Sequence, residues 1–183
     1  MELSMRLKKA LDALESSDLE SRVRAVDDLA VCSSEIFERV AVAFKSEREA
    51  PHLIAERMGR FGSLMIPQLE RVYREADEGG FKLMAASALL HMGSEVGIPS
   101  LMAAVVAGDP HLCMAAMSLA AAGVSEAATP IEKCLIECEL SDVKTLECLT
   151  SSLRLLDHPI SEETRIHLAR VEPKWLRDSL TSW

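Results

Sequence analysis

The stretch FKLMAASALLHMGSEVGIPSL, residues 81–101, is crowded with small and aliphatic side chains and carries only two charges, Lys82 and Glu95. Alanine, leucine and methionine favour helices, and the aromatic residues favoured in strands make up only 4% of the chain. Gly93 follows the alanine-rich run and Pro99 comes six residues later. Because glycine ends helices and proline begins them, the stretch predicts two helices joined by a short loop.

The alanine-rich pattern recurs every 30 residues along the chain. Steps of thirty from Ala85 lead to four further positions, which are Ala25, Ala55, Ala115 and Thr145. The residue two places earlier is apolar in every case, and so is the residue four places later except at Gly59. These positions share one side of a helix, so each unit begins with a helix that has a small residue at the centre of its buried stripe. A small residue there allows neighbouring helices to approach closely.

A second helix is predicted in each unit, and Pro67, Pro99 and Pro130 mark its start in three of them. We expect Asp109, Thr129 and Ser141 to open helices as N-terminal caps, and Trp175 to seal the last interface. Five helix pairs follow, near residues 18–49, 50–79, 80–108, 109–140 and 141–171, with capping segments at 1–17 and 172–183. A chain of 183 residues is expected to form one all-α domain over residues 1–183.

The pattern A-x-x-A-L-x-x-x-G, followed by P-x-L, is carried by AASALLHMGSEVGIPSL at residues 85–101. It resembles the short HEAT repeats of the phycobilisome-lyase type, over roughly residues 18–170. The resemblance implies an α-solenoid that winds as a right-handed superhelix. It also implies that the second helices line a concave face, where partners bind.

Motifs for catalysis are missing from the sequence. It contains no phosphate-binding glycine loop, no G-x-S-x-G, no H-E-x-x-H and no C-x-x-C. HEAT-type diiron hydroxylases need His-Glu pairs, and the dipeptide HE does not occur. HEAT-type alkylpurine glycosylases present a basic groove to DNA, whereas no Lys or Arg lies between Lys82 and Lys133. The sequence therefore predicts a chain that is not an enzyme and needs no cofactor.

The cysteines offer two interpretations. Cys134 and Cys138 lie one helical turn apart, and Cys113, Cys148 and His111 are further candidates for a zinc site. The spacing matches no standard zinc signature, so we favour reduced thiols that pack as small apolar residues, which predicts no metal. An odd number of cysteines without a disulfide framework is typical of a cytoplasmic protein.

Charge points to the kind of partner. The net charge is −9, and residues 83–143 contain seven acidic side chains against one basic side chain, Lys133. Such a surface repels nucleic acid and anionic lipid and favours a basic protein, although an acidic surface that only keeps the protein in solution is an equal alternative. No uncharged apolar run approaches the roughly 18 residues of a membrane span, so no membrane contact is expected.

The second helices carry the predicted binding site. Their alignment on Leu69, Leu101 and Ile131 gives an apolar centre in the middle helix between charged neighbours, as in many protein interfaces. The predicted partner-binding residues are Met102, Val106, Ala103, Glu70, Arg71, Arg74, Glu132, Lys133 and Ile136. The alternative is that helix packing simply buries Val106.

Three functions fit these observations. The first is an adaptor or assembly module that binds another protein. A narrower form of it is an antidote, an immunity protein that neutralises a basic toxin. The third follows from the resemblance alone: a bilin-lyase-like enzyme or pigment chaperone.

Overall fold

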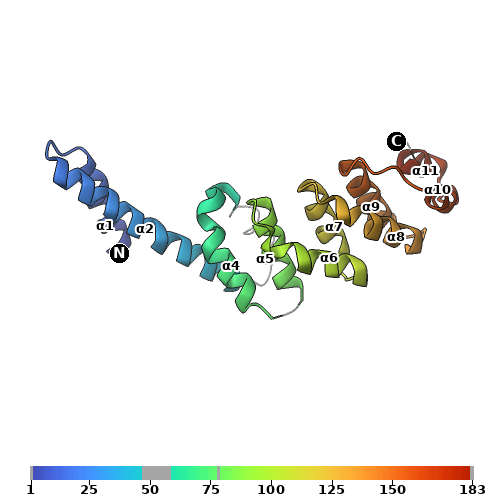
Figure 1. Cartoon of the computed structure of the whole chain (residues 1–183), viewed down its shortest axis with the longest axis horizontal. Helices are drawn as coiled ribbons and strands as arrows, with labels where there is room; N and C mark the ends of the chain where they lie inside the picture. Colours follow the sequence, from blue (N-terminus) through green and yellow to red (C-terminus); the bar gives the residue numbers. More distant parts are fainter. Residues whose placement is uncertain (1, 47–58, 78, 182–183) are drawn as a thin grey trace. The chain divides into compact units, whose positions relative to one another are not determined.

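The computed structural model describes residues 2–46, 59–77 and 79–181 (Figure 1). Within these ranges every regular element is a helix and no strand occurs, which confirms the all-α prediction. None of the helices in these ranges has the length and apolar character needed to cross a membrane. The chain divides into two compact units, Met1–Pro51 and His52–Trp183. The single domain expected over 1–183 stays a prediction.

The first unit is a helical hairpin. Helix α1 (Glu2–Leu14) lies alongside α2 (Leu19–Ser46), to which it is joined by a short turn (Figure 1). Asp18 precedes α2 and accepts hydrogen bonds from the backbone N–H of Ser21 at 2.8 Å and from its hydroxyl at 2.7 Å. These bonds satisfy donors at the start of α2 that have no partner within the helix, so they fix where it begins.

The helix pair predicted within residues 18–49 is not found. Helix α2 is continuous over 28 residues, because no glycine or proline interrupts residues 19–46. Ala25 is buried as predicted, but Val23, expected on the same buried stripe, is more than half exposed. The first unit is therefore a hairpin of α1 with α2, and the first 30-residue step does not mark a pair of its own.

The second unit is a succession of short helices that lie in two rows. The elements are η1 (Gly59–Met65), α4 (Ile66–Glu75), α5 (Gly80–His91), η2 (Glu95–Gly97), α6 (Ile98–Ala107), α7 (Leu112–Ala121), η3 (Ser125–Ala127), α8 (Ala128–Glu137), α9 (Val143–Leu155), α10 (Glu162–Leu168) and α11 (Lys174–Thr181). In one row α5, α7, α9 and α11 pack each on the next. In the other row α6 packs on α8, and α8 on α10, while α5–α6, α6–α7 and α8–α9 contacts join the rows.

The buried stripe predicted for the first helix of each pair is present in α5 and α7. Ala85 and Ala115 are fully buried, as are Leu89 and Leu119 four residues later. Ala55, the equivalent position one step earlier, lies outside the described residues. The small side chains sit where neighbouring helices meet, so the period of 30 residues marks the interior of this unit.

Similar turns end α5, α7 and α9. After α5, Gly93 has a φ of 88°, and the N–H of Ser94 donates to the carbonyl of Leu89 at 2.9 Å. Gly123 after α7 and Asp157 after α9 also have positive φ, and each turn contains the same bond to the residue five places back. This conformation satisfies the last carbonyls of a helix and is adopted most easily by glycine. Gly93 and Gly123 therefore predict the first two turns, whereas Asp157 gives no such signal for the third.

The predicted starts of α8 and α9 are wrong by one or two residues. Thr129 does not cap α8, because that helix begins at Ala128 directly after the 3-10 turn η3. Asp142, rather than Ser141, caps α9 by accepting bonds from the N–H and the hydroxyl of Thr145 at 3.2 and 2.7 Å. Both errors arise because several Ser, Thr and Asp residues adjoin each helix start and can all serve as caps.

The end of the second unit is sealed by leucines and not by the tryptophan. Trp175 was expected to cover the last interface, yet it is 68% exposed. Leu176 and Leu180 lie on the buried side of α11 and join the hydrophobic core with Leu168 of α10. The indole points to solvent because it stands one residue before the buried Leu176–Leu180 spacing.

Candidate functional site

The centre of the predicted binding site lies on α6. Val106 is 70% exposed, so the alternative in which helix packing buries it is wrong. Ala103 is exposed as well, while Met102 is half-buried and packs against the core. The outer side of α6 therefore consists of small and branched apolar side chains, and the helix carries no charged residue at all.

Charged side chains stand on the helices next to α6. Arg71 and Arg74 are exposed on α4, and Lys133 is exposed on α8. Each of them lies near an acidic residue of its own helix: Arg71 is 3.9 Å from Glu75 and Lys133 is 3.8 Å from Glu137. Exposed pairs of this kind contribute little to stability.

We name the outer sides of these helices the second-helix face. It consists of Arg71, Arg74, Ala103, Val106, Lys133 and Ile136. Helix α6 contacts α8, and the Tyr73 hydroxyl of α4 is 2.7 Å from the Ser100 hydroxyl of α6, which connects the three helices. Lys82 of α5 places its ammonium 5.5 Å from the centre of the Tyr73 ring. This junction was not predicted, although the single tyrosine of so aliphatic a chain is a sequence signal that could have revealed it.

Glu70, predicted as part of the rim, is largely used inside the protein. Its side chain is 21% exposed and forms an ion pair with Arg74 at 2.6 Å. It also accepts a hydrogen bond at 3.1 Å from the hydroxyl of Ser94, in the loop between α5 and α6. Glu70 therefore links α4 to the loop that precedes α6. This structural link is its main role, and its predicted contact with a partner stays a prediction.

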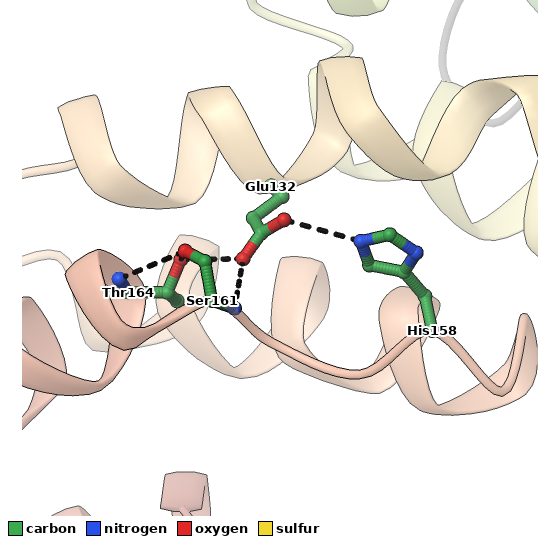
Figure 2. A network of polar contacts seen from close by, with 4 residues as sticks. All are labelled: Glu132, His158, Ser161 and Thr164. Carbon is green, nitrogen blue, oxygen red and sulfur yellow. Dashed lines mark hydrogen bonds and ion pairs between the residues drawn. The ribbon is translucent and has the colours of Figure 1, made fainter.

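Glu132, the equivalent residue on α8, is even more fully engaged (Figure 2). One carboxylate oxygen accepts bonds of 2.6 Å from the backbone N–H of Ser161 and from the hydroxyl of Thr164. The other oxygen lies 3.1 Å from Nε2 of His158. Only 14% of the side chain is exposed. The carboxylate thus holds α8 against the start of α10, where Ser161 caps the helix by accepting a bond from the Thr164 N–H.

The surroundings of Glu132 keep it ionised. Partial burial tends to raise the pKa of its carboxyl, but the bonds from Ser161, Thr164 and His158 outweigh burial and lower the pKa to about 2. A carboxylate held this way is poorly suited to donate or accept a proton near neutral pH, because a general acid or base works best with a pKa near the working pH. The cluster therefore fits a structural role. The sequence offers Ser161 as a candidate cap for α10 but carries no signal that joins this cap to Glu132.

Two hollows lie along the second helices. The first, of about 440 Å³, runs beside α6 with Leu83, Ala103 and Ala107 in its lining and Asp109 at the α6–α7 turn. Asp109 was predicted to cap a helix, but α7 begins at Leu112 directly after His111; Asp109 instead accepts a bond of 2.7 Å from the N–H of His111 in the turn before α7. The lining is mainly small and combines apolar side chains with the polar groups of Ser100 and Asp109, so this hollow offers a partner a site of mixed character beside Ala103 and Ala107.

The second hollow lies between α8 and the start of α10 and has a volume of about 410 Å³. Lys133 and Ile136 from the predicted site line it, together with Glu132, Glu137 and Glu163. Three carboxylates face one ammonium here, so this end of the second-helix face is acidic. A basic segment of a partner would be attracted to it.

The cysteines are arranged as packing residues. All five are free thiols. The Cys134 thiol donates to the carbonyl of Val105 at 3.1 Å, and the Cys148 thiol donates to the carbonyl of Cys113 at 3.4 Å. Burial raises the pKa of the Cys148 thiol to about 12, so it stays protonated at neutral pH. Across the part of the chain that the structure describes, no three His, Cys, Asp or Glu side chains converge as a metal would require.

Comparisons of the chain with protein-family models, with curated proteins and with solved structures find no match. The HEAT resemblance therefore rests on the repeated sequence pattern alone. What the arrangement itself offers is a surface: an apolar helix between charged ones, with one hollow beside α6 and a second hollow between α8 and the start of α10.

Proposed function

We propose that the chain is a non-catalytic, HEAT-like α-solenoid that binds another protein through its second-helix face. The order of helix contacts supports a solenoid, because α5–α7–α9–α11 and α6–α8–α10 pack in sequence order and no late helix returns to an early one among the principal contacts. The repeated turns after α5, α7 and α9 support a repeat origin for these helix pairs.

The exposure of Val106 carries the proposal of protein binding. Val106 is a branched apolar side chain that is 70% exposed on a helix without charged residues, and its neighbours Ala103 and Ala107 line a hollow beside α6. Exposed charges on α4 and α8 flank it, which is the usual layout of an interface with an apolar centre and a polar rim. The partner is basic where it meets the hollow lined by Glu137 and Glu163. An adaptor and an antidote against a basic toxin both fit this description.

The test compares two matched substitutions on the two rows of helices. Val106→Glu should weaken binding of a partner captured by the intact chain by about 2 kcal/mol or more, roughly 30-fold, because it places a charge at the apolar centre. Leu155→Glu changes another aliphatic residue that is more than half exposed, at the end of α9 in the other row, and should leave affinity within about twofold. Both affinities are measured by calorimetric titration with the purified partner. Loss of binding in Leu155→Glu with none in Val106→Glu would place the binding face on the other row.

A further inference from the structure

Helix α2 carries two apolar stripes, of which its neighbour α1 covers one. Ala25 and Cys32 are buried and lie on one side of α2. Leu19, Val23 and Val26 lie on a second side, about 140° around the helix from the first, since each residue advances the helix by about 100°. All three are more than half exposed. Their spacing of four and three residues is that of a helix that packs on another helix.

The exposed stripe continues into a buried one. Further along the same side of α2, in the same register, stand Phe37, Ala41 and Phe44, all buried. A single seam thus runs along α2, covered at its C-terminal half and open at its N-terminal half. Local stability does not explain the open half, because valine is a weaker helix former than alanine, lysine or glutamate. A surface that covers Val23 and Val26 would explain it.

Helix α1 extends the open seam into a face two helices wide. Arg6 pairs with Asp28 at 3.0 Å, which fixes the level of the two antiparallel helices. Leu11, which is half exposed, then lies level with Val23 and turns toward the same side of the hairpin. Two antiparallel helices that share one apolar face form half of a four-helix bundle.

We propose that this face, formed by Leu11, Leu19, Val23 and Val26, binds the same face of a second copy of the chain. The two hairpins form a four-helix bundle around a two-fold axis parallel to the helices. That axis places α1 of one copy against α2 of the other at the same level.

Charge complementarity favours a second copy over an unrelated helix. Lys8 of α1 lies level with Val26, so the two-fold axis brings it beside Asp27 on α2 of the other copy, and the contact occurs twice. Within the part of the chain that the structure describes, neither Lys8 nor Asp27 has an ion-pair partner. The open seam from Leu19 to Val26 covers only about 10 Å of helix, so the contact is small and the dimer dissociates in the micromolar range.

Sedimentation equilibrium of the full chain over a range of micromolar concentrations tests the proposal. The intact protein should show a reversible monomer–dimer equilibrium. Val23→Glu should raise the dissociation constant about tenfold or more, because each copy would then bury a charge at the seam. Val31→Glu is the matched control: Val31 is a similarly exposed valine of α2 on another side, so the constant should not change. A chain that stays monomeric throughout, or two variants with equal effects, would overturn the proposal.

Exchanging the charges of Lys8 and Asp27 tests the proposed dimer even if Val23→Glu loses helix content in far-UV circular dichroism. Lys8→Glu and Asp27→Lys should each weaken the dimer severalfold, since each places like charges together, and the double variant should recover it. If the dissociation constant of the double variant is raised by the product of the two single effects, Lys8 and Asp27 do not meet across the interface, which contradicts the proposed dimer. The result does not depend on the second-helix face, which belongs to the other unit and is tested by binding of a partner.

Discussion

The carboxylate of Glu132 secures a junction between residues far apart in the sequence, because Ser161 and Thr164 are 29 and 32 positions away. Glu132→Ala removes the acceptor for both groups, and Thr164 is fully buried. We expect a loss of about 1–3 kcal/mol in the free energy of unfolding at pH 7, since hydrogen bonds to a charged group are among the stronger ones. Urea titration measures it. Glu147→Ala on the exposed side of α9 is the control and should change stability by less than about 0.5 kcal/mol.

The same residue predicts a dependence on acid. The folded state lowers the pKa of Glu132 from 4.5 to about 2, so its stabilising effect is complete above about pH 4.5 and disappears as the pH falls toward 2. The difference in unfolding free energy between the intact chain and Glu132→Ala should therefore shrink between pH 5 and about pH 2.5. An equal difference at pH 7 and pH 3 would show that the ionised carboxylate is not what holds the junction.

At the scale of residues, the sequence predicts positions that follow a local period and misses those fixed by distant partners. Ala85 and Ala115 could be assigned to the interior because spacing within one helix settles which side they share. Glu132 was predicted as a rim residue, since nothing near it in sequence indicates that Ser161 and Thr164 are its donors. Its neighbour Lys133 is exposed as expected, and its role in binding stays a prediction.

At the scale of elements, the turn η2 lies very close to α5. A Cβ on Gly97 would lie 2.7 Å from the Cα and the carbonyl oxygen of Ala86, and backbone within a helix cannot easily move aside. The φ of Gly97 is −82°, so the lack of space, and not the backbone conformation, requires glycine. Thirty residues later the equivalent position is Ala127, where a methyl group is accommodated.

Gly97→Ala should therefore destabilise the protein by about 1–3 kcal/mol through overpacking between α5 and η2. Gly93→Ala provides a comparison from the same loop, because a Cβ there meets nothing within 4 Å while φ is 88°. Its cost of about 1 kcal/mol is conformational. Thermal unfolding of both variants and of Gly97→Ser distinguishes overpacking from conformational strain. The larger serine side chain should lower stability further at position 97, because the space there is limiting. Equal stability of Gly97→Ala and the intact chain would disprove the close approach.

Element boundaries were predictable where glycine and proline punctuate the chain and not elsewhere. Helices α4, α6 and α8 begin within two residues of Pro67, Pro99 and Pro130. The pair expected over 18–49 failed because the apolar pattern of α2 suits both a repeat and one long helix. The absence of Gly and Pro from residues 19–46 was the better guide.

At the scale of the whole molecule, the second unit joins helices that are near in sequence. Contacts run from α5 to α7, from α7 to α9 and from α9 to α11, so the hydrophobic core is long and each part of it depends on its neighbours. Sequence analysis could anticipate this from the 30-residue period, because a repeat that cannot bury its own apolar face must stack. It could not anticipate which faces stay open, since exposure of Val106 depends on where the chain places α4 and α8.

A linear stack and a compact bundle respond differently to damage at one end, which tests the proposed solenoid. Leu180 is almost fully buried in α11, at the end of the core. Leu180→Ala should cost about 2–4 kcal/mol locally, and in a linear stack that loss loosens the terminal helices first. Segment-resolved hydrogen exchange should then show protection reduced about tenfold or more in α10 and α11, with α5 and α6 unchanged.

Leu119→Ala, in the middle of the stack, should instead lower protection of the helices on both sides of α7. Uniform loss of protection from α5 to α11 in Leu180→Ala would mean that the second unit unfolds as one compact body, and the solenoid proposal would have to be given up.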